Sequence, residues 1–175
     1  MTNWKIIAFF LAGTLVLLLS LRIQGRQLIT PHASAGILSL ELSYQVDDAR
    51  AIIQEWKPSL RSAFHINMIL DFLFIPCYGL FLYSICGFFS VLFKTGWAQR
   101  LGVLLAFGSI LAMIFDILEN MAMCFSFHFY STQFLATITA GIATLKFLLV
   151  GLAVMYGLLS AVFLLIFWKK KLQAG

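Results

Sequence analysis

Ionisable side chains inside the long apolar stretches of this sequence are the residues best placed to do chemistry. They are Asp71, Asp116, Glu119 and Lys146. A charged group in the hydrocarbon layer of a membrane costs roughly 2.5–3.5 kcal/mol, so each one needs a partner, a proton or a ligand. A carboxyl group there could bind a cation, contact a ligand, or act as a general acid or base. The sequence does not single out a catalytic residue among them.

The spacing of these residues predicts that they meet in one layer of a helical bundle. Asp116, Glu119 and Asn120 follow an i, i+3, i+4 pattern and share one helix face. At 1.5 Å per residue, the charged groups lie about 22 to 33 Å from the cytoplasmic ends of their segments. We therefore predict a polar cluster of Asn67, Asp71, Asp116, Glu119, Asn120 and Lys146, which Arg61 and His65 could join.

Two interpretations of this cluster are structural and one is functional. In the first, Lys146 pairs with Asp116 or Glu119, Asp71 pairs with Arg61, and the network fixes the register of the helices. In the second, Asp71 and Lys146 only extend to the membrane interface. In the third, the cluster is a polar site that opens outward beneath a long loop. The surplus of acids over bases favours this third interpretation, because an unpaired carboxylate near lipid needs a cation, a proton or a ligand.

The composition requires a membrane as the solvent for most of the chain. Of the 175 residues, 62 % are hydrophobic and only 11 % are charged, with a mean hydropathy of +0.97. Soluble domains have about 25 % charged residues. The apolar segments are continuous, without the period-two alternation of strands, and each can cross a layer of roughly 30 Å as a helix. We predict an all-α membrane protein, a four-transmembrane-helix bundle in a single domain (1–175), with spans at about 4–21, 66–93, 101–125 and 136–168.

The first connection, residues 22–65, is long and holds most of the soluble-type sequence. Residues 30–43 are predicted to be extended, because apolar and polar side chains alternate in their second half. Residues 47–56 are predicted to form a short amphipathic helix with acids in its first turn and Pro58 at its end. We expect this helix to lie on the membrane surface or to cap the bundle. Its apolar face is made by Ala49, Ile52, Ile53 and Trp56.

The distribution of lysine and arginine predicts that both termini are cytoplasmic and that residues 22–65 are extracytoplasmic. Basic residues in the first connection are diluted over a long loop and mixed with acids, whereas those on the other side flank the spans directly. Those flanking residues are Lys5, Lys94, Arg100, Lys169, Lys170 and Lys171. The first apolar run could pass for a signal peptide, but no small-x-small site follows directly, so we expect an uncleaved span.

Other site chemistries have little support. Cys77, Cys86 and Cys124 lie in apolar segments without a CxxC pair. The sequence has no HExxH or paired ExxH motif, no nucleophile elbow, no P-loop and no dinucleotide fingerprint, so we predict no metal site and no cofactor. The net charge of +5 does not indicate nucleic acid, since the one basic run follows an apolar helix and is typical of a stop-transfer anchor.

Two strings resemble patterns in a family of small, uncharacterised bacterial four-span membrane proteins. They are Leu70-Asp71-Phe72-Leu73-Phe74-Ile75-Pro76-Cys77-Tyr78 and Phe115-Asp116-Ile117-Leu118-Glu119-Asn120. In that family a similar LDFLF…Y helix is followed by a D-x-x-E-N helix, and residues 36–56 are similar too, so the resemblance would cover most of the chain. It implies the inner membrane of a bacterium. The family has no assigned activity, so the resemblance implies no function.

Three functions follow from these observations. The leading hypothesis is a non-enzymatic membrane protein that binds a lipid-like or small amphipathic ligand, or a partner membrane protein, at an outward-facing polar cluster. The second is an intramembrane enzyme that acts on a lipid or isoprenoid, with Asp116 or Glu119 as acid or base. The third is a structural or assembly subunit without a site. Membrane lipids surround the chain in all three, and the sequence leaves an oligomer open.

Overall fold

The computed structural model describes the backbone of residues 4–93 and 96–173 and the side chains of these residues up to 166. Lys94 and the side chains of Lys169, Lys170 and Lys171, on which the predicted orientation partly rests, lie outside this description. The described residues form helices and no strand, as predicted. In chain order the elements are α1 (Trp4–Gly25), the 3-10 turn η1 (Arg26–Leu28), α2 (Ile37–Glu41), α3 (Val46–Ser59), α4 (Arg61–Leu92), α5 (Trp97–His128) and α6 (Gln133–Gln173).

Four of these helices, α1, α4, α5 and α6, are long and apolar enough to cross a membrane. They agree in number and place with the four predicted spans, although most of them extend further than predicted. Helix α4, for example, begins at Arg61 rather than at residue 66, and α5 ends at His128 rather than at residue 125. Hydropathy marks only the apolar part of a helix, and polar residues continue the same helix beyond it.

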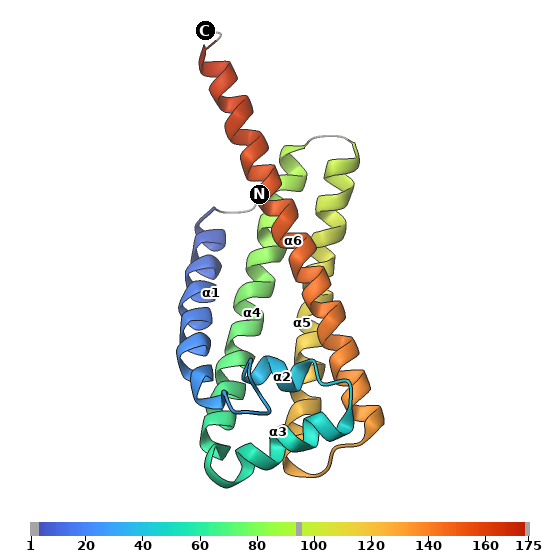
Figure 1. The fold of residues 1–175 in the computed structure, drawn as a ribbon. Helices are drawn as coiled ribbons and strands as arrows, with labels where there is room; N and C mark the ends of the chain where they lie inside the picture. Colours follow the sequence, from blue (N-terminus) through green and yellow to red (C-terminus); the bar gives the residue numbers. More distant parts are fainter. Residues whose placement is uncertain (1–3, 94–95, 174–175) are drawn as a thin grey trace.

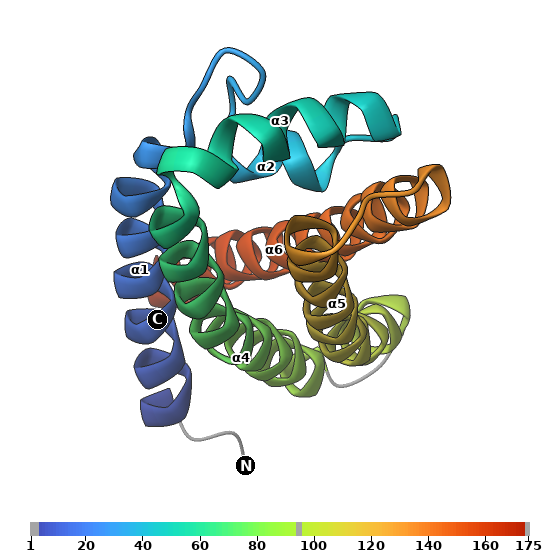
Figure 2. The ribbon, with the colours of Figure 1, turned by 90° about the horizontal axis from the view of Figure 1, so that it is seen from below.

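Helix α4 holds the bundle together. It packs against α1, α5 and α6, and α5 packs in turn against α6 (Figures 1 and 2). None of the described residues of α1 is buried, so α1 lies at the edge of the bundle and contacts mainly α4. The arrangement leaves α1 and α6 on either side of α4.

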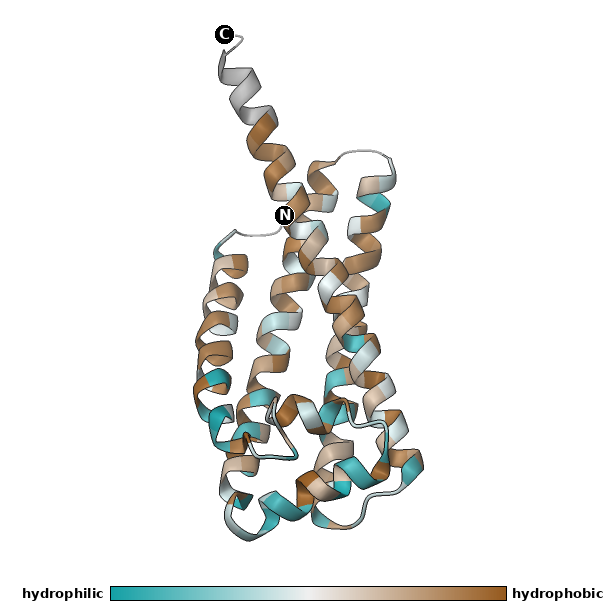
Figure 3. Ribbon diagram, viewed as in Figure 1, coloured by the Kyte–Doolittle hydropathy of each residue, from teal (hydrophilic) through white to brown (hydrophobic). Residues whose placement is uncertain are grey.

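The surface of the long helices is apolar. Figure 3 shows hydrophobic residues along their length and hydrophilic residues gathered around α3 and the adjacent turns. Leu104, Phe107 and Leu158 are each at least 60 % exposed. Monomeric soluble proteins rarely expose contiguous apolar surface on this scale. The helices and their surface are therefore those of a multi-pass membrane protein.

Helices α2 and α3 lie crosswise at the end of the bundle where α4 begins and α5 ends (Figures 1 and 2). The predicted apolar face of α3 is buried there against Phe64 of α4 and against Met123 and Phe127 of α5. The opposite face carries Arg50, Gln54 and Lys57, all exposed. The prediction of an amphipathic helix that caps the bundle is confirmed, with the face made by Ala49, Ile52, Ile53 and Trp56 inside.

The loop between η1 and α2 is fastened to α3 through Glu55. The Thr30 hydroxyl donates a hydrogen bond of 2.5 Å to Glu55 Oε2, and His32 Nδ1 lies 3.1 Å from Oε1. The hydrogen bond from Thr30, followed by those from His32, lowers the pKa of the Glu55 carboxyl below its usual range. This contact keeps the loop next to α3 and positions the start of α2.

Two predictions for the loop were wrong in detail. Residues 37–41 form the short helix α2 rather than an extended segment, after Gly36 turns the chain at φ 61°. This short helix buries two adjacent residues, Leu40 and Glu41, which an extended strand would place on opposite faces. An alternation of only six residues is too short to distinguish a strand from a single helical turn. Helix α3 continues through Pro58 and ends at Ser59, because proline in the last turns removes little hydrogen bonding from a helix.

Candidate functional site

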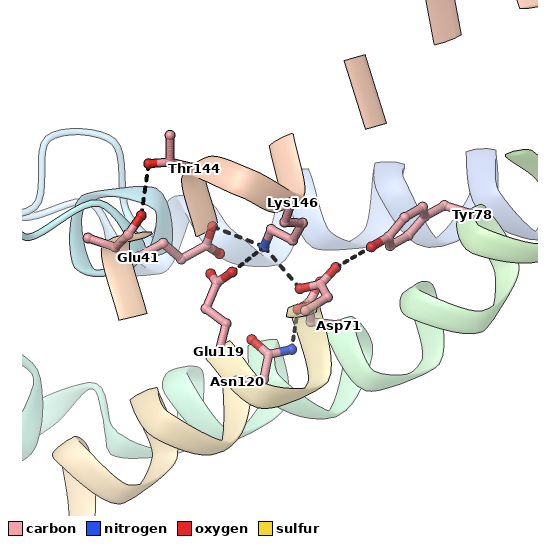
Figure 4. Close-up of polar contacts among 9 residues, drawn as sticks. Glu41, Asp71, Tyr78, Glu119, Asn120, Thr144 and Lys146 are labelled. Carbon is pink, nitrogen blue, oxygen red and sulfur yellow. Dashed lines mark hydrogen bonds and ion pairs between the residues drawn. The ribbon is translucent and has the colours of Figure 1, made fainter. Parts of the chain in front are cut away.

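Lys146 is the centre of a buried ionic cluster. Its Nζ lies 2.9 Å from Asp116 Oδ1, 2.9 Å from Glu119 Oε2 and 3.5 Å from Glu41 Oε2 (Figure 4). The four side chains are at most 7 % exposed. The predicted ion pair between Lys146 and an acid of the third span is confirmed, and both acids take part in it.

The helices place these groups by simple periodicity. Asp116 and Glu119 are three residues apart, on the buried face of α5 that also carries Asn120 and Met123. Lys146 faces them from α6, the helix that packs along α5. Glu41 comes from the end of α2, which contacts both α5 and α6. The cluster therefore ties the loop to two membrane helices.

Helix α4 is joined to the same cluster by two further hydrogen bonds. The Tyr78 hydroxyl donates to Asp116 Oδ2 at 2.7 Å, and Asn120 Nδ2 donates to Asp71 Oδ2 at 2.5 Å (Figure 4). Both Asp116 oxygens are thus engaged, one by an ammonium and one by a hydroxyl. Asp71 is only partly buried and takes its hydrogen bond from an uncharged amide.

Three residues predicted to belong to the cluster form no hydrogen bond or ion pair with it among the described residues, although Asn67 lines the same cavity. Asn67 is buried but donates to Gln24 Oε1 at 2.6 Å, which joins α4 to α1. His65 Nε2 is 3.0 Å from His128 Nε2, where α4 begins and α5 ends. Arg61 is exposed at the first residue of α4, and Asp71 bonds Asn120 instead of the arginine predicted as its partner.

Glu41 is the member of the cluster that the sequence analysis did not find. It was assigned to an extended stretch and so had no predicted position. Burial raises the pKa of the Glu41 carboxyl, and Lys146 acts in the opposite direction. The sequence does contain one hint of this position. Glu41 lies between the apolar residues Leu40 and Leu42, in the loop that precedes the spans carrying the other charged residues.

The cluster has more acid than base. Among the described residues, Glu41, Asp71, Asp116 and Glu119 face a single ammonium group. Two buried oxygens, Glu119 Oε1 and Asn120 Oδ1, have neither a hydrogen-bond partner nor an ion-pair partner in the described part of the chain. Buried polar atoms are normally satisfied, so the cluster has acceptor capacity to spare. The described residues hold no group of three or more metal-binding side chains.

A partly open cavity of about 750 Å³ reaches this cluster. It lies between α1 and α6, with α4 as its back wall and α2 at its polar end. Its polar lining includes Glu41, Asp71, Asp116 and Lys146, whereas Glu119 does not line it. The rest is largely apolar and includes Leu18 and Leu21 of α1, Phe74, Phe81 and Leu82 of α4, and Val150 and Val154 of α6.

The arrangement can hold a molecule with one apolar part and one polar part. The apolar walls favour a hydrocarbon chain, and the carboxylates of Glu41, Asp71 and Asp116 at the polar end favour a group that donates hydrogen bonds or carries positive charge. Comparisons with family models, curated proteins and solved structures found no match.

Proposed function

We propose that this membrane protein binds a lipid-like or small amphipathic ligand in the cavity between α1 and α6. The observation that carries the proposal is a cavity with apolar walls that ends at a charged cluster. Its volume of about 750 Å³ lies within the usual range of small-molecule sites. The ligand's hydrocarbon part lies against residues such as Leu18 and Val150, and its head reaches Asp71.

The proposed site faces outward. The lysines and arginines that flank the spans favour cytoplasmic termini in a bacterial inner membrane, which puts α2, α3 and the polar end of the cavity on the extracytoplasmic side. A ligand would then enter from the outer leaflet, in the plane of the membrane, between α1 and α6.

Copurified lipid tests the proposed binding. Native mass spectrometry of the detergent-purified chain is expected to show one amphiphile bound per protein. Val150→Trp places a large side chain in the cavity and should lower the affinity for the amphiphile roughly tenfold, which corresponds to about 1.4 kcal/mol of binding free energy and lowers the bound fraction. Leu148→Trp is the matched control, because Leu148 is 59 % exposed on another face of α6 and does not line the cavity. Equal bound fractions in both variants would contradict the proposal.

Cysteine labelling tests the orientation. A cysteine at Ser34, which is exposed in the loop before α2, should react with a membrane-impermeant maleimide in intact cells. A cysteine at Gln173, at the end of α6, should react only after the cells are lysed. The unmodified chain measures any background from its three native cysteines, none of which is exposed. The reverse pattern would place the loop and the mouth of the cavity in the cytoplasm.

A further inference from the structure

We propose that the ligand is a zwitterionic aminophospholipid, whose ammonium group binds Asp71 and whose phosphate binds Arg22 and Arg26. This inference rests on the function proposed above and adds the chemistry of the head group. It follows from a charge pattern in which one acid and two bases line the same cavity, and none of the three forms an ion pair with another described residue.

Asp71 is the carboxylate of the cluster that forms no ion pair with a described residue. It lines the cavity and is partly exposed, and it accepts a hydrogen bond from Asn120. Lys146, the ammonium within the cluster, already has three other carboxylates within 3.5 Å. No described residue forms an ion pair with Asp71. An amine of the ligand would supply the missing positive charge and give a charge-assisted hydrogen bond.

The polar end of the cavity, where the cluster lies, repels anions. Glu41 and Asp116 line it beside Asp71, and Glu41 Oε2 is buried without a hydrogen-bond partner in the described part of the chain. An anionic group placed here would lie among three carboxylates that share one ammonium. The part of the head that reaches this end must therefore be positively charged or a neutral donor of hydrogen bonds.

Arg22 and Arg26 supply the opposite charge at the mouth of the same cavity. They lie four residues apart, at the end of α1 and in η1, and both line the cavity and are exposed. The described residues provide neither of them with a carboxylate partner. Arginine binds phosphate through two parallel hydrogen bonds, and the end of an apolar span is where phospholipid phosphates lie.

Contacts between α1 and α4 hold the two arginines and Asp71 at a similar depth along the bundle. Gln24, two residues after Arg22, accepts a hydrogen bond from Asn67, which is one turn before Asp71 on α4. Gln24 also donates to the carbonyl of Ala63 at 2.6 Å. The end of α1 is thereby fixed against the part of α4 that carries Asp71, and we expect one head group to contact Asp71 and the two arginines together.

Other lipid heads fit less well. A phosphate without an amine, as in phosphatidylglycerol, would satisfy the arginines and leave Asp71 without a cation. A neutral diacylglycerol would leave Asp71 and both arginines without partners. Phosphatidylethanolamine satisfies all three groups, and the apolar walls accommodate part of its acyl chains.

Lipid competition on the purified full-length chain tests this assignment. Phosphatidylethanolamine should bind roughly tenfold more tightly than phosphatidylglycerol of the same chain length, since the amine adds one charge-assisted hydrogen bond. Asp71→Asn should abolish this preference and leave phosphatidylglycerol binding intact, and Asp71→Glu should retain the preference. Arg22→Gln combined with Arg26→Gln should weaken both phospholipids and spare diacylglycerol. Arg61→Gln, at an exposed residue outside the cavity, is the control for a loss of charge.

The outcomes separate this inference from the proposed function. The head-group assignment is overturned if the unmodified chain shows no preference for phosphatidylethanolamine, or if Asp71→Asn leaves that preference unchanged. The proposed function still stands in either case if Val150→Trp lowers lipid binding. If Val150→Trp also has no effect, the cavity is not the site and both proposals fail. Phosphoethanolamine without acyl chains should compete roughly 100-fold more weakly than the lipid. If phosphoethanolamine competes as well as phosphatidylethanolamine, the ligand is a soluble solute and the assignment of a lipid is wrong.

Discussion

Lys146→Met is expected to lower the free energy of unfolding by about 3–5 kcal/mol, because it leaves buried carboxylates without their cation. Asp116 and Glu119 each lie 2.9 Å from Nζ, and both are nearly inaccessible to solvent. Methionine keeps most of the side-chain volume, so the loss measures charge rather than packing. Chemical unfolding in detergent micelles, followed by circular dichroism, gives the difference.

Substitutions of the partner acids test whether the stability lost in Lys146→Met comes from uncompensated charge or from altered packing. Adding Glu119→Gln to Lys146→Met should recover part of the lost stability, and adding Asp116→Asn as well should recover most of it. Lys57→Met, at an exposed position of α3, should change the free energy of unfolding by less than about 0.5 kcal/mol. If Lys146→Met costs no more than Lys57→Met, the cluster does not stabilise the fold.

The central ion pairs could be predicted from the sequence because they depend on helix periodicity and depth alone. Asp116 and Glu119 share a face at a spacing of three residues, and Lys146 lies at a similar depth on another span. Arg61 and His65 did not join them for the same reason. They precede Asp71 by ten and six residues, spacings that place them on other faces of α4.

Glu41 and the cavity could not be predicted in this way. Glu41 reaches the cluster because Gly36 turns the chain and the loop is fastened to α3, and neither contact has a periodic signal. The cavity is the space left where side chains of α1 and α6 do not meet over α4. That space depends on how three helices pack, which a single segment of sequence does not encode.

The cap over the site should depend on Trp56 more than on any other residue of α3. Trp56 is 0 % exposed, and its ring centroid lies 6.2 Å from that of Phe64. Phe64 of α4 in turn stacks on Phe127 of α5, with ring centroids 4.0 Å apart, so these three aromatic rings connect α3 with α4 and α5. Trp56→Ala is expected to lower the free energy of unfolding by about 3–5 kcal/mol, the usual range for a fully buried aromatic residue.

Two variants of the same helix test the cause of that loss. Trp56→Phe keeps most of the ring contacts and removes the buried Nε1–H, which has no hydrogen-bond partner among the described residues, so it should cost less than about 1.5 kcal/mol. Gln54→Ala, on the exposed face, should stay within about 0.5 kcal/mol. Hydrogen exchange should show faster exchange in α3 for Trp56→Ala alone, because the undocked helix loses its protection. If exchange in α3 is the same for Trp56→Ala and Gln54→Ala, Trp56 does not anchor the cap.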